Sequence, residues 1–188
     1  MKFLYGLLFT LSLTLTLNAA TYEGLVFTPR GKSTIALKST GKKYLLVPAN
    51  DEIASQISKL KSTDFVSLDG HLNNEQQIIS VQSLNYVGLH DLLGDWSGDD
   101  DYCYSFASFS DLRIFIKNDK NKCDFQESHK SRDFGYTINP ATQGWLVLLS
   151  DNDDSYLMDL AIKSKTTVEL SLYDSQSGDI LRNIKLKR

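Results

Sequence analysis

Two acidic clusters contain the side chains of this sequence that are best suited to chemistry. The first cluster holds Asp95, Asp99, Asp100 and Asp101, and the second holds Asp151, Asp153 and Asp154. Carboxylate oxygens that crowd into a loop are ligands that Ca²⁺ prefers, and calcium sites in extracellular modules are often weak. The candidate metal ligands are Asp99, Asp101, Asp151 and Asp153.

The second cluster begins like the calcium loop of an EF-hand but does not continue like one. Asp151, Asp153 and Ser155 place oxygen-bearing side chains at every second position, as that loop does at its start. Tyr156 then stands where the loop needs glycine, and Ile162 stands where it needs a bidentate glutamate. The sequence therefore excludes an EF-hand. Two interpretations stay open: a calcium site of another kind, or solvated turns whose charges prevent sheet edges from pairing. No other cofactor is indicated.

The histidines form no catalytic pattern. His71, His90 and His129 lie in unlike surroundings, and although Asp91 follows His90, neighbouring residues of a strand point to opposite faces. The sequence also has no nucleophile elbow, no His-Glu-x-x-His motif, no phosphate-binding loop and no paired-cysteine zinc spacing. These absences favour a protein that is not an enzyme. A hydrolase that uses carboxylates of the acidic loops is the rival.

Cys103 and Cys123 are the two cysteines, and an even number favours one disulfide in an oxidising compartment. Cysteines on two strands that flank a third would lie about 9.6 Å apart, whereas bridged Cα atoms lie within about 7 Å. The bridge therefore requires Cys123 to lie in a loop that crosses back. It would stabilise the fold by about 3 kcal/mol on the chain-entropy model. Two free thiols are the alternative.

The first twenty residues have the pattern of a secretory signal peptide. Lys2 supplies a positive charge, residues 3–17 form an apolar run, and Ala19 and Ala20 are the small residues expected before a cleavage site. We expect cleavage after Ala20, with a cut after Ala19 as the alternative. The run is shorter than the ~20 residues of a membrane-spanning helix. We therefore expect a periplasmic or secreted protein, with no stable membrane insertion after cleavage.

Charge is distributed unevenly along the rest of the chain. Residues 21–90 carry seven basic and six acidic side chains, whereas residues 91–188 carry twelve basic and seventeen acidic ones. An acidic half is a poor electrostatic partner for nucleic acid or anionic lipid. Together with export, this argues against nucleic acid as a partner and favours a protein or glycan of the cell envelope.

The pattern of residues 21–88 predicts three strands, one helix and two further strands. The helix follows Asn50, a good N-cap residue, and has Ile53, Ile57 and Leu60 on one face. Gly70 predicts a kink or bulge in the fourth strand. The expected strands are 22–28, 33–39, 43–47, 64–72 and 77–87.

This order of elements resembles the oligonucleotide/oligosaccharide-binding fold, or OB-fold, and the segment 64–70 looks like the entry to its fourth strand. The resemblance covers residues 21–88 and implies a five-stranded Greek-key barrel with one helix. A basic rim beside the first three strands, with Tyr44 as an aromatic platform, would be the binding surface. Its candidate residues are Arg30, Lys32, Lys42, Lys43 and Tyr44. The alternatives are Tyr44 in the core and a barrel that serves purely as scaffold.

The second half shows the two-residue alternation of half-buried strands and almost no helical pattern. Turn-forming residues separate the alternating runs. We expect residues 102–188 to form an antiparallel β-sandwich or small barrel, joined to the first domain by a linker over 89–101. The alternating residues include Tyr102, Tyr104, Phe106, Leu112, Ile114, Ile116, Phe134, Tyr136, Ile138, Tyr156, Met158, Leu160, Val168, Leu170, Leu172, Ile184 and Leu186.

Gly94-Asp95-Trp96, at the start of this half, resembles the glycine-x-tryptophan that opens lipocalin-type barrels. The resemblance implies that Trp96 closes one end of a calyx for a small apolar ligand, which makes Trp96 a candidate binding residue. The alternative is that Trp96 packs at the junction of two domains.

These observations predict a mostly β, exported, non-enzymatic protein that recognises a protein or glycan partner through its loops. A small-ligand carrier built on the second half and a carboxylate-dependent hydrolase are the alternatives. The shape of the molecule separates the three. A deep pocket with convergent carboxylates would favour the hydrolase, and a closed apolar cavity beneath Trp96 would favour the carrier. Two filled barrels would favour partner recognition.

Overall fold

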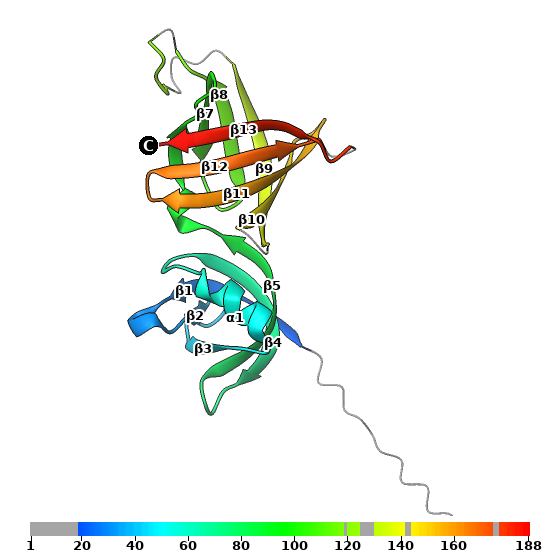
Figure 1. Ribbon diagram of the computed structural model, residues 1–188. Helices are drawn as coiled ribbons and strands as arrows, with labels where there is room; N and C mark the ends of the chain where they lie inside the picture. The colour runs from blue at the N-terminus through cyan, green and yellow to red at the C-terminus, as the bar shows by residue number, and fades with distance from the viewer. Residues whose placement is uncertain (1–18, 119, 125–129, 142–143, 175–176) are drawn as a thin grey trace, which may run out of the picture.

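The computed structural model describes residues 19–118, 120–124, 130–141, 144–174 and 177–188. Most of the predicted signal peptide, residues 1–20, lies outside these ranges, so export stays a prediction. The described chain is mostly β and folds into two closed barrels that lie one beyond the other (Figure 1). None of the described helices has the length and apolar character needed to cross a membrane.

Five strands form the first barrel: β1 Ala20–Phe27, β2 Thr34–Leu37, β3 Lys43–Pro48, β4 Phe65–Asn73 and β5 Ile78–Gly88. Their order is β1-β2-β3-β5-β4, and β4 pairs with β1 to close the barrel. β3 and β5 run parallel, and the other neighbours run antiparallel. The 3₁₀ turn Pro29–Gly31 links β1 to β2, and helix α1, Asp51–Ser58, links β3 to β4. The predicted order of three strands, one helix and two strands is confirmed.

Local sequence explains the start of α1 and the irregularity in β4. Asn50 Oδ1 accepts a hydrogen bond from the backbone N of Ile53 at 2.9 Å, which is the predicted N-cap. The pairing of β4 with β5 shifts register between Asp69 and Gly70. A Cβ at Gly70 would lie 2.4 Å from the carbonyl oxygen of Ser80, so the two backbones approach too closely for any other residue. The predicted bulge at Gly70 is confirmed.

Eight strands form the second barrel: β6 Gly94–Ser97, β7 Tyr102–Phe106, β8 Asp111–Ile116, β9 Ser131–Pro140, β10 Trp145–Ser150, β11 Ser155–Ser164, β12 Thr167–Tyr173 and β13 Ile180–Lys187. Each strand pairs antiparallel with the next, and β13 returns to β6 at the pair Lys187 and Ser97. Of the two expected architectures, the small barrel is the correct one. β6 lies within residues 89–101, so the second barrel begins inside the expected linker, just after the 3₁₀ turn His90–Leu92.

Alternation along each strand sends one apolar row into the second barrel. On β9, Phe134, Tyr136 and Ile138 are buried, whereas Gly135 and Thr137 between them are exposed. Successive strands repeat this pattern, so their inward rows meet in one continuous core. The two-residue pattern read from the sequence thus identifies the face of the sheet that turns inward.

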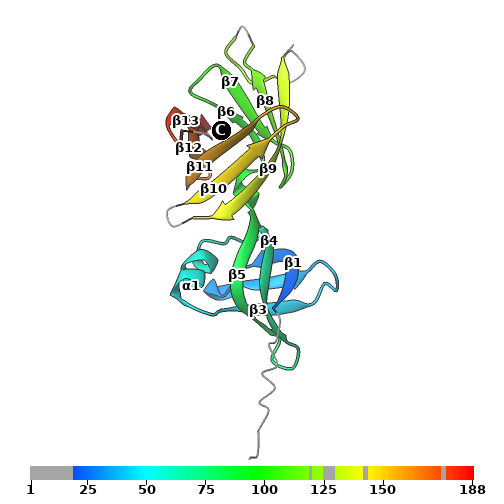
Figure 2. The same cartoon turned by 90° about the vertical axis from the view of Figure 1, so that its right-hand side faces the viewer.

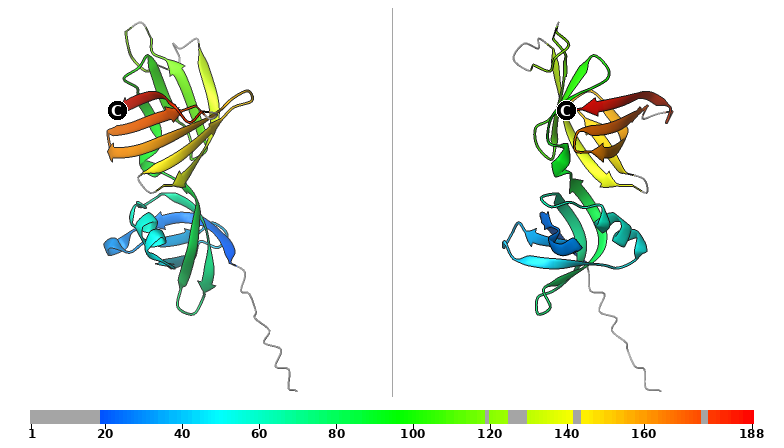
Figure 3. Two further views of the ribbon diagram at one scale, coloured as in Figure 1. Left: turned by 45° about the vertical axis from the view of Figure 1, so that its right-hand side comes forward. Right: turned by 60° about the vertical axis from the view of Figure 1, so that its left-hand side comes forward.

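The two barrels meet near the end of β5 (Figures 2 and 3). Aromatic and polar groups make the contacts there. Phe109, in the turn between β7 and β8, stacks on Phe65 of β4 with ring centroids 6.1 Å apart. Tyr86 of β5 donates a hydrogen bond to the backbone oxygen of Phe109. Asp64, just before β4, accepts a hydrogen bond from the backbone N of His90 at 2.8 Å. The end of the second barrel that holds the β7–β8 turn therefore faces the first barrel, and its other end faces away.

Candidate ligand-binding site

The end of the second barrel that faces away from the first opens into a cavity of about 600 Å³. Its apolar walls include Ile114 and Ile116 of β8, Phe134 of β9, and Tyr156 and Met158 of β11. Small-molecule sites have volumes of about 300–1,000 Å³ and mostly hydrophobic linings. The cavity therefore has the size and the surface that suit a small apolar molecule.

The cavity ends where the barrel becomes fully packed. Tyr102 and Leu172, which line it, are partly buried, whereas Phe106 and Leu170, which lie deeper on the same two strands, are each 1% exposed. The interior of an eight-stranded barrel is just wide enough for side chains to fill or for one small ligand. This barrel is filled near the junction with the first barrel and open at the far end.

Three cationic side chains line the same cavity: Lys130, Arg132 and Arg182. Arg132 lies opposite Ile114 in the pairing of β8 with β9, and Arg182 lies opposite Leu172 in the pairing of β12 with β13. Within the described ranges, no Asp or Glu lines the cavity. The lining therefore combines apolar walls with positive charge near the mouth.

Arg132 is held at the mouth by an aromatic ring and two carboxylates. Its guanidinium carbon lies 5.0 Å from the ring centroid of Phe134. Its Nε lies 2.5 Å from Asp151 Oδ2, and its Nη2 lies 2.6 Å from Asp154 Oδ2. The hydrogen bond from Arg132 is the main reason that the pKa of Asp151 is lowered, and the backbone N–H groups of Asp154 and Asp153 lower it further. Asp151 is therefore a stable anion that orients the guanidinium of Arg132.

Arg182 is held by a looser contact with Asp100. Its Nη1 lies 3.3 Å from Asp100 Oδ2, and the same oxygen accepts a hydrogen bond from the hydroxyl of Tyr104 at 2.8 Å. Burial, followed by the charge of Asp100, raises the pKa of Tyr104, so this phenol stays protonated as a donor. Charge-assisted N–H···O bonds are usually about 2.7–2.9 Å long. The contact of Arg182 with Asp100 is longer, so this guanidinium is the more readily available of the two.

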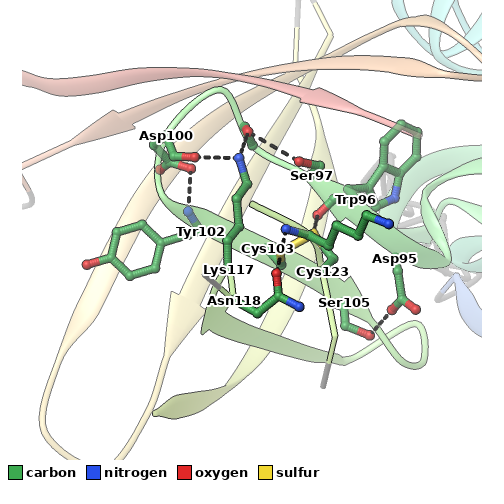
Figure 4. Close-up of a disulfide and its surroundings, with 12 residues drawn as sticks. Asp95, Trp96, Ser97, Asp100, Tyr102, Cys103, Ser105, Lys117, Asn118 and Cys123 are labelled. Atoms are coloured by element: carbon green, nitrogen blue, oxygen red, sulfur yellow. Dashed lines mark hydrogen bonds between the residues drawn. A yellow bond between two sulfur atoms is a disulfide. The ribbon is translucent and has the colours of Figure 1, made fainter. Parts of the chain in front are cut away.

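The predicted disulfide between Cys103 and Cys123 is confirmed (Figure 4). The two Cα atoms lie 5.6 Å apart, and Cys123 lies in the loop after β8, as the bridge requires. Lys117 of the same loop donates hydrogen bonds to the carbonyl oxygens of Gly98 at 2.6 Å and Asp100 at 2.7 Å. The bridged loop therefore holds the β6–β7 turn in place, and with it the carboxylate of Asp100 at the mouth.

Trp96 closes the opposite end of the second barrel. Its side chain is 1% exposed, and its Nε1 donates a hydrogen bond to the backbone oxygen of Leu92 at 2.7 Å. The guanidinium carbon of Arg188 lies 4.1 Å from a ring centroid of Trp96, and Arg188 also donates to the backbone oxygen of Leu93. Trp96 thus packs near the domain junction, and the lining of the cavity at the far end does not include it.

The binding surface expected on the first barrel has its cations but lacks its aromatic platform. Tyr44 is 4% exposed, and its hydroxyl donates a hydrogen bond to Asn74 Oδ1 at 2.9 Å. It points into the barrel together with Leu46, two residues along β3, so the platform is wrong and Tyr44 is a core residue. The basic side chains expected on the rim are exposed: Arg30, Lys32, Lys42 and Lys43.

The four acidic candidates for a calcium site are not brought together. Asp99 Oδ1 accepts a hydrogen bond from the backbone N of Lys185 at 2.9 Å, while Asp151 bonds to Arg132 and to its own turn. In the part of the chain that the structure describes, no three His, Cys, Asp or Glu side chains gather closely enough to hold a metal ion. Calcium binding by Asp99, Asp101, Asp151 and Asp153 stays a prediction from sequence.

A second cleft, of about 550 Å³, lies between the barrels and contains carboxylates that already have partners. Asp91 forms an ion pair with Lys61. Asp64 accepts hydrogen bonds from the backbone N of Lys61 at 2.7 Å and from that of His90 at 2.8 Å. Burial raises the pKa of Asp64, and these two bonds oppose the rise. Asp64 therefore ties the first barrel to the turn His90–Leu92, which leads into the second barrel. The hydrolase alternative stays a prediction from sequence.

Sequence reasoning missed the residues that give the cavity its charge. Arg132 and Arg182 precede Phe134 and Ile184 by two positions, and the alternation already placed Phe134 and Ile184 in the core. Extending the same alternation by one step toward the start of β9 and β13 would have identified both arginines as inward-facing.

No protein-family model matches the chain, and no curated protein or solved structure is similar enough to it to count as a match. The resemblances to the OB-fold and to lipocalin-type barrels therefore stay predictions, supported by barrel topology alone.

Proposed function

We propose that the protein binds a small, largely apolar molecule in the open end of its second barrel. The observation that carries this proposal is the cavity of about 600 Å³, whose walls are apolar side chains from several strands. Apolar groups that remain accessible inside a concavity mark ligand sites, because burying them against a ligand removes them from water. The proposal adopts the small-ligand carrier that the sequence left as an alternative.

The position of the cavity differs from the expected one. The sequence suggested a closed cavity beneath Trp96, whereas the cavity opens to solvent at the other end of the barrel. An open mouth favours a ligand that enters and leaves without unfolding of the barrel. The packed end, with Trp96 and its neighbours, would then serve as a fixed floor.

We also propose that the protein binds this molecule outside the cytoplasm. The disulfide between Cys103 and Cys123 is compatible with an oxidising compartment, where such bonds persist. Recognition of a protein or glycan partner through loops stays a prediction alongside it.

The test is binding of N-phenyl-1-naphthylamine, a neutral apolar probe whose fluorescence rises when it leaves water. We expect saturable binding to the purified protein with its disulfide intact. Two substitutions, Leu172→Trp in the wall and Ile116→Trp at the mouth, add bulk inside the cavity and should weaken binding about tenfold or more, a loss of ~1.4 kcal/mol.

The matched control is Leu148→Trp. Leu148 is 49% exposed on the outer face of β10, so the same bulky residue there leaves the cavity unchanged. The proposal is overturned if the wild-type protein shows no saturable binding. It is also overturned if both cavity variants keep a normal melting temperature and bind the probe as tightly as the control.

A further inference from the structure

We infer that the molecule bound in the cavity carries an anionic head group, a carboxylate or a phosphate monoester on an apolar chain, and that Arg132 and Arg182 bind this head group. The inference rests on the proposed function, because it assigns the chemical class of the ligand to the same cavity. It adds a specific polar contact to an otherwise apolar site.

The sign of the charge at the lining carries the inference. Lys130, Arg132 and Arg182 line the cavity, and within the described ranges no carboxylate does. The carboxylates that pair with the arginines, Asp100, Asp151 and Asp154, belong to the turns around the mouth and do not line the cavity. A ligand inside the cavity therefore meets positive charge first. An anion is attracted there, and a cation is repelled.

The two arginines are placed to contact a head group at the mouth. Their side chains are 44% exposed for Arg132 and 52% exposed for Arg182, so a ligand can reach both. Arg132 lies over the ring of Phe134 at 5.0 Å, and Arg182 lies 6.0 Å from that of Tyr102. These rings belong to the cavity wall, so an apolar chain against them would place its head group beside the guanidinium groups.

The described contacts of the arginines leave donors for a ligand. Arg132 uses Nε and Nη2 toward its two carboxylates, and Arg182 uses Nη1 toward Asp100. A guanidinium carries five N–H donors in a planar fork that matches carboxylate and phosphate groups. An anionic head group can therefore join these ion pairs, or displace the long contact of Arg182, without leaving a buried charge unpaired.

The experiment displaces bound N-phenyl-1-naphthylamine with ligands that share a ten-carbon chain and differ in the head group. Decanoate, decyl phosphate, 1-decanol and decyltrimethylammonium are compared at pH 7.5, below the micelle concentrations of the charged ligands and below the solubility limit of 1-decanol. We expect decanoate or decyl phosphate to displace the probe at concentrations about tenfold lower than 1-decanol, and the cation to be weakest. Whichever anion is stronger identifies the head group as carboxylate or phosphate.

Two variants and a matched control test whether the preference for an anionic head group comes from the arginines at the mouth. Arg182→Gln and Arg132→Gln should each remove most of the preference for the anion over 1-decanol. Arg113→Gln removes an arginine that also pairs with an aspartate, Asp133, but on the outer face of β8 and β9, and it should keep the preference. Added salt should weaken binding of the anion and leave binding of 1-decanol unchanged, because salt screens the exposed charges of the arginines.

The outcomes separate this inference from the proposed function. If the probe binds and all head groups displace it equally, the anionic head group is wrong and the apolar site stands. The same conclusion follows if Arg182→Gln folds normally and keeps the full preference. If the probe does not bind at all, the proposed function fails, and the inference fails with it.

Discussion

The first barrel closes with five strands and the second with eight, and the two differ in what fills them. Interior residues of the first barrel, such as Ile35, Val66 and Ile79, are 0% exposed. The second barrel is equally packed beside the junction but opens at its far end into a cavity of about 600 Å³. The diameter of a barrel grows with its number of strands. Five strands therefore leave room for side chains alone, whereas eight leave additional space for a ligand.

Strands of one kind can therefore build either a scaffold or a site. Both barrels alternate apolar and polar residues, and both have buried apolar rows. The difference arises at the mouth of the second barrel, where the inward row ends in Arg132 and Arg182 rather than in apolar residues. We therefore expect the second barrel to have a rigid packed end around Trp96, an adaptable mouth at Arg132 and Arg182, and a weaker link to the first barrel through Asp64.

The largest effect is expected at the floor. Trp96→Ala removes a side chain that is 1% exposed and should lower the free energy of unfolding by about 3–5 kcal/mol. Leu181→Ala, at the mouth where Leu181 is 53% exposed, should change it by less than about 0.5 kcal/mol. Urea unfolding followed by circular dichroism measures both. Equal effects at the two positions would contradict the division into floor and mouth.

The disulfide comes next. Replacing Cys103 and Cys123 together by alanine removes a bridge between residues 20 positions apart. The loop-closure model predicts a loss of about 3 kcal/mol in the free energy of unfolding. The first barrel contains neither cysteine, so its unfolding should be unaffected when followed by hydrogen exchange of β1–β5. A parallel loss in both barrels would instead show that they unfold as one unit.

A smaller effect is expected at the tie between the barrels. Asp64→Asn places an amide NH₂ against backbone N–H donors of Lys61 and His90 and should cost about 1–3 kcal/mol at pH 7. Because the pKa of Asp64 is raised on folding, the folded protein binds a proton more tightly than the unfolded chain. The wild type therefore gains stability from this group as the pH falls through the raised pKa toward the ordinary value of 3.8.

Asparagine does not titrate, so the stability difference between the wild type and Asp64→Asn should grow over that pH range. Urea unfolding at several pH values between neutral and mildly acidic conditions measures this difference. A difference that shrinks on acidification would mean that the pKa of Asp64 is lowered on folding, and the junction would then resemble the ion pairs of the mouth.

The smallest effect is expected where Arg188 covers Trp96 at the packed end of the second barrel. Arg188→Ala removes the cation–π contact with Trp96 and the hydrogen bond to the backbone oxygen of Leu93, and it should cost about 1 kcal/mol. Lys187→Ala is the neighbouring control, because Lys187 is exposed and should contribute little. Thermal unfolding compares the two variants. If both variants unfold at the same temperature, the guanidinium of Arg188 does not stabilise the packed end around Trp96.

Much of the fold could be predicted from local patterns. Asn50 and the apolar stripe after it predict the helix, and Gly70 predicts the bulge. The alternation of apolar and polar residues predicts which face of each strand turns inward. Closure of the second barrel could not be predicted, because it depends on the return of β13 to β6 across the whole domain. A short strand such as β6, within a glycine-rich segment, carries too few residues to show its alternation.

The candidate site was harder to predict, because it depends on where a barrel stops being filled. For Tyr44 the sequence left a surface platform and the core open, and its alternation with Leu46 pointed to the core, where the side chain lies. Arg132 and Arg182 looked like ordinary surface charges, since a cation at a strand end is usually solvated. Their inward direction follows from the alternation along β9 and β13. The cavity itself depends on the balance of side-chain volumes across eight strands, and no single segment of sequence contains that balance.

The short pairing between β13 and β6 makes this the place where the second barrel should open most easily. The described strand pairing there is limited to Lys187 and Ser97, with two further hydrogen bonds between Lys185 and Asp99, whereas other neighbouring strands pair over several residues. Brief opening at this pairing should let the backbone amides of β13 exchange with solvent faster than those of β10 and β11. Opening would also expose two strand edges, and the charged Lys185 and Lys187 on β13 would then keep another copy of the chain from pairing with them.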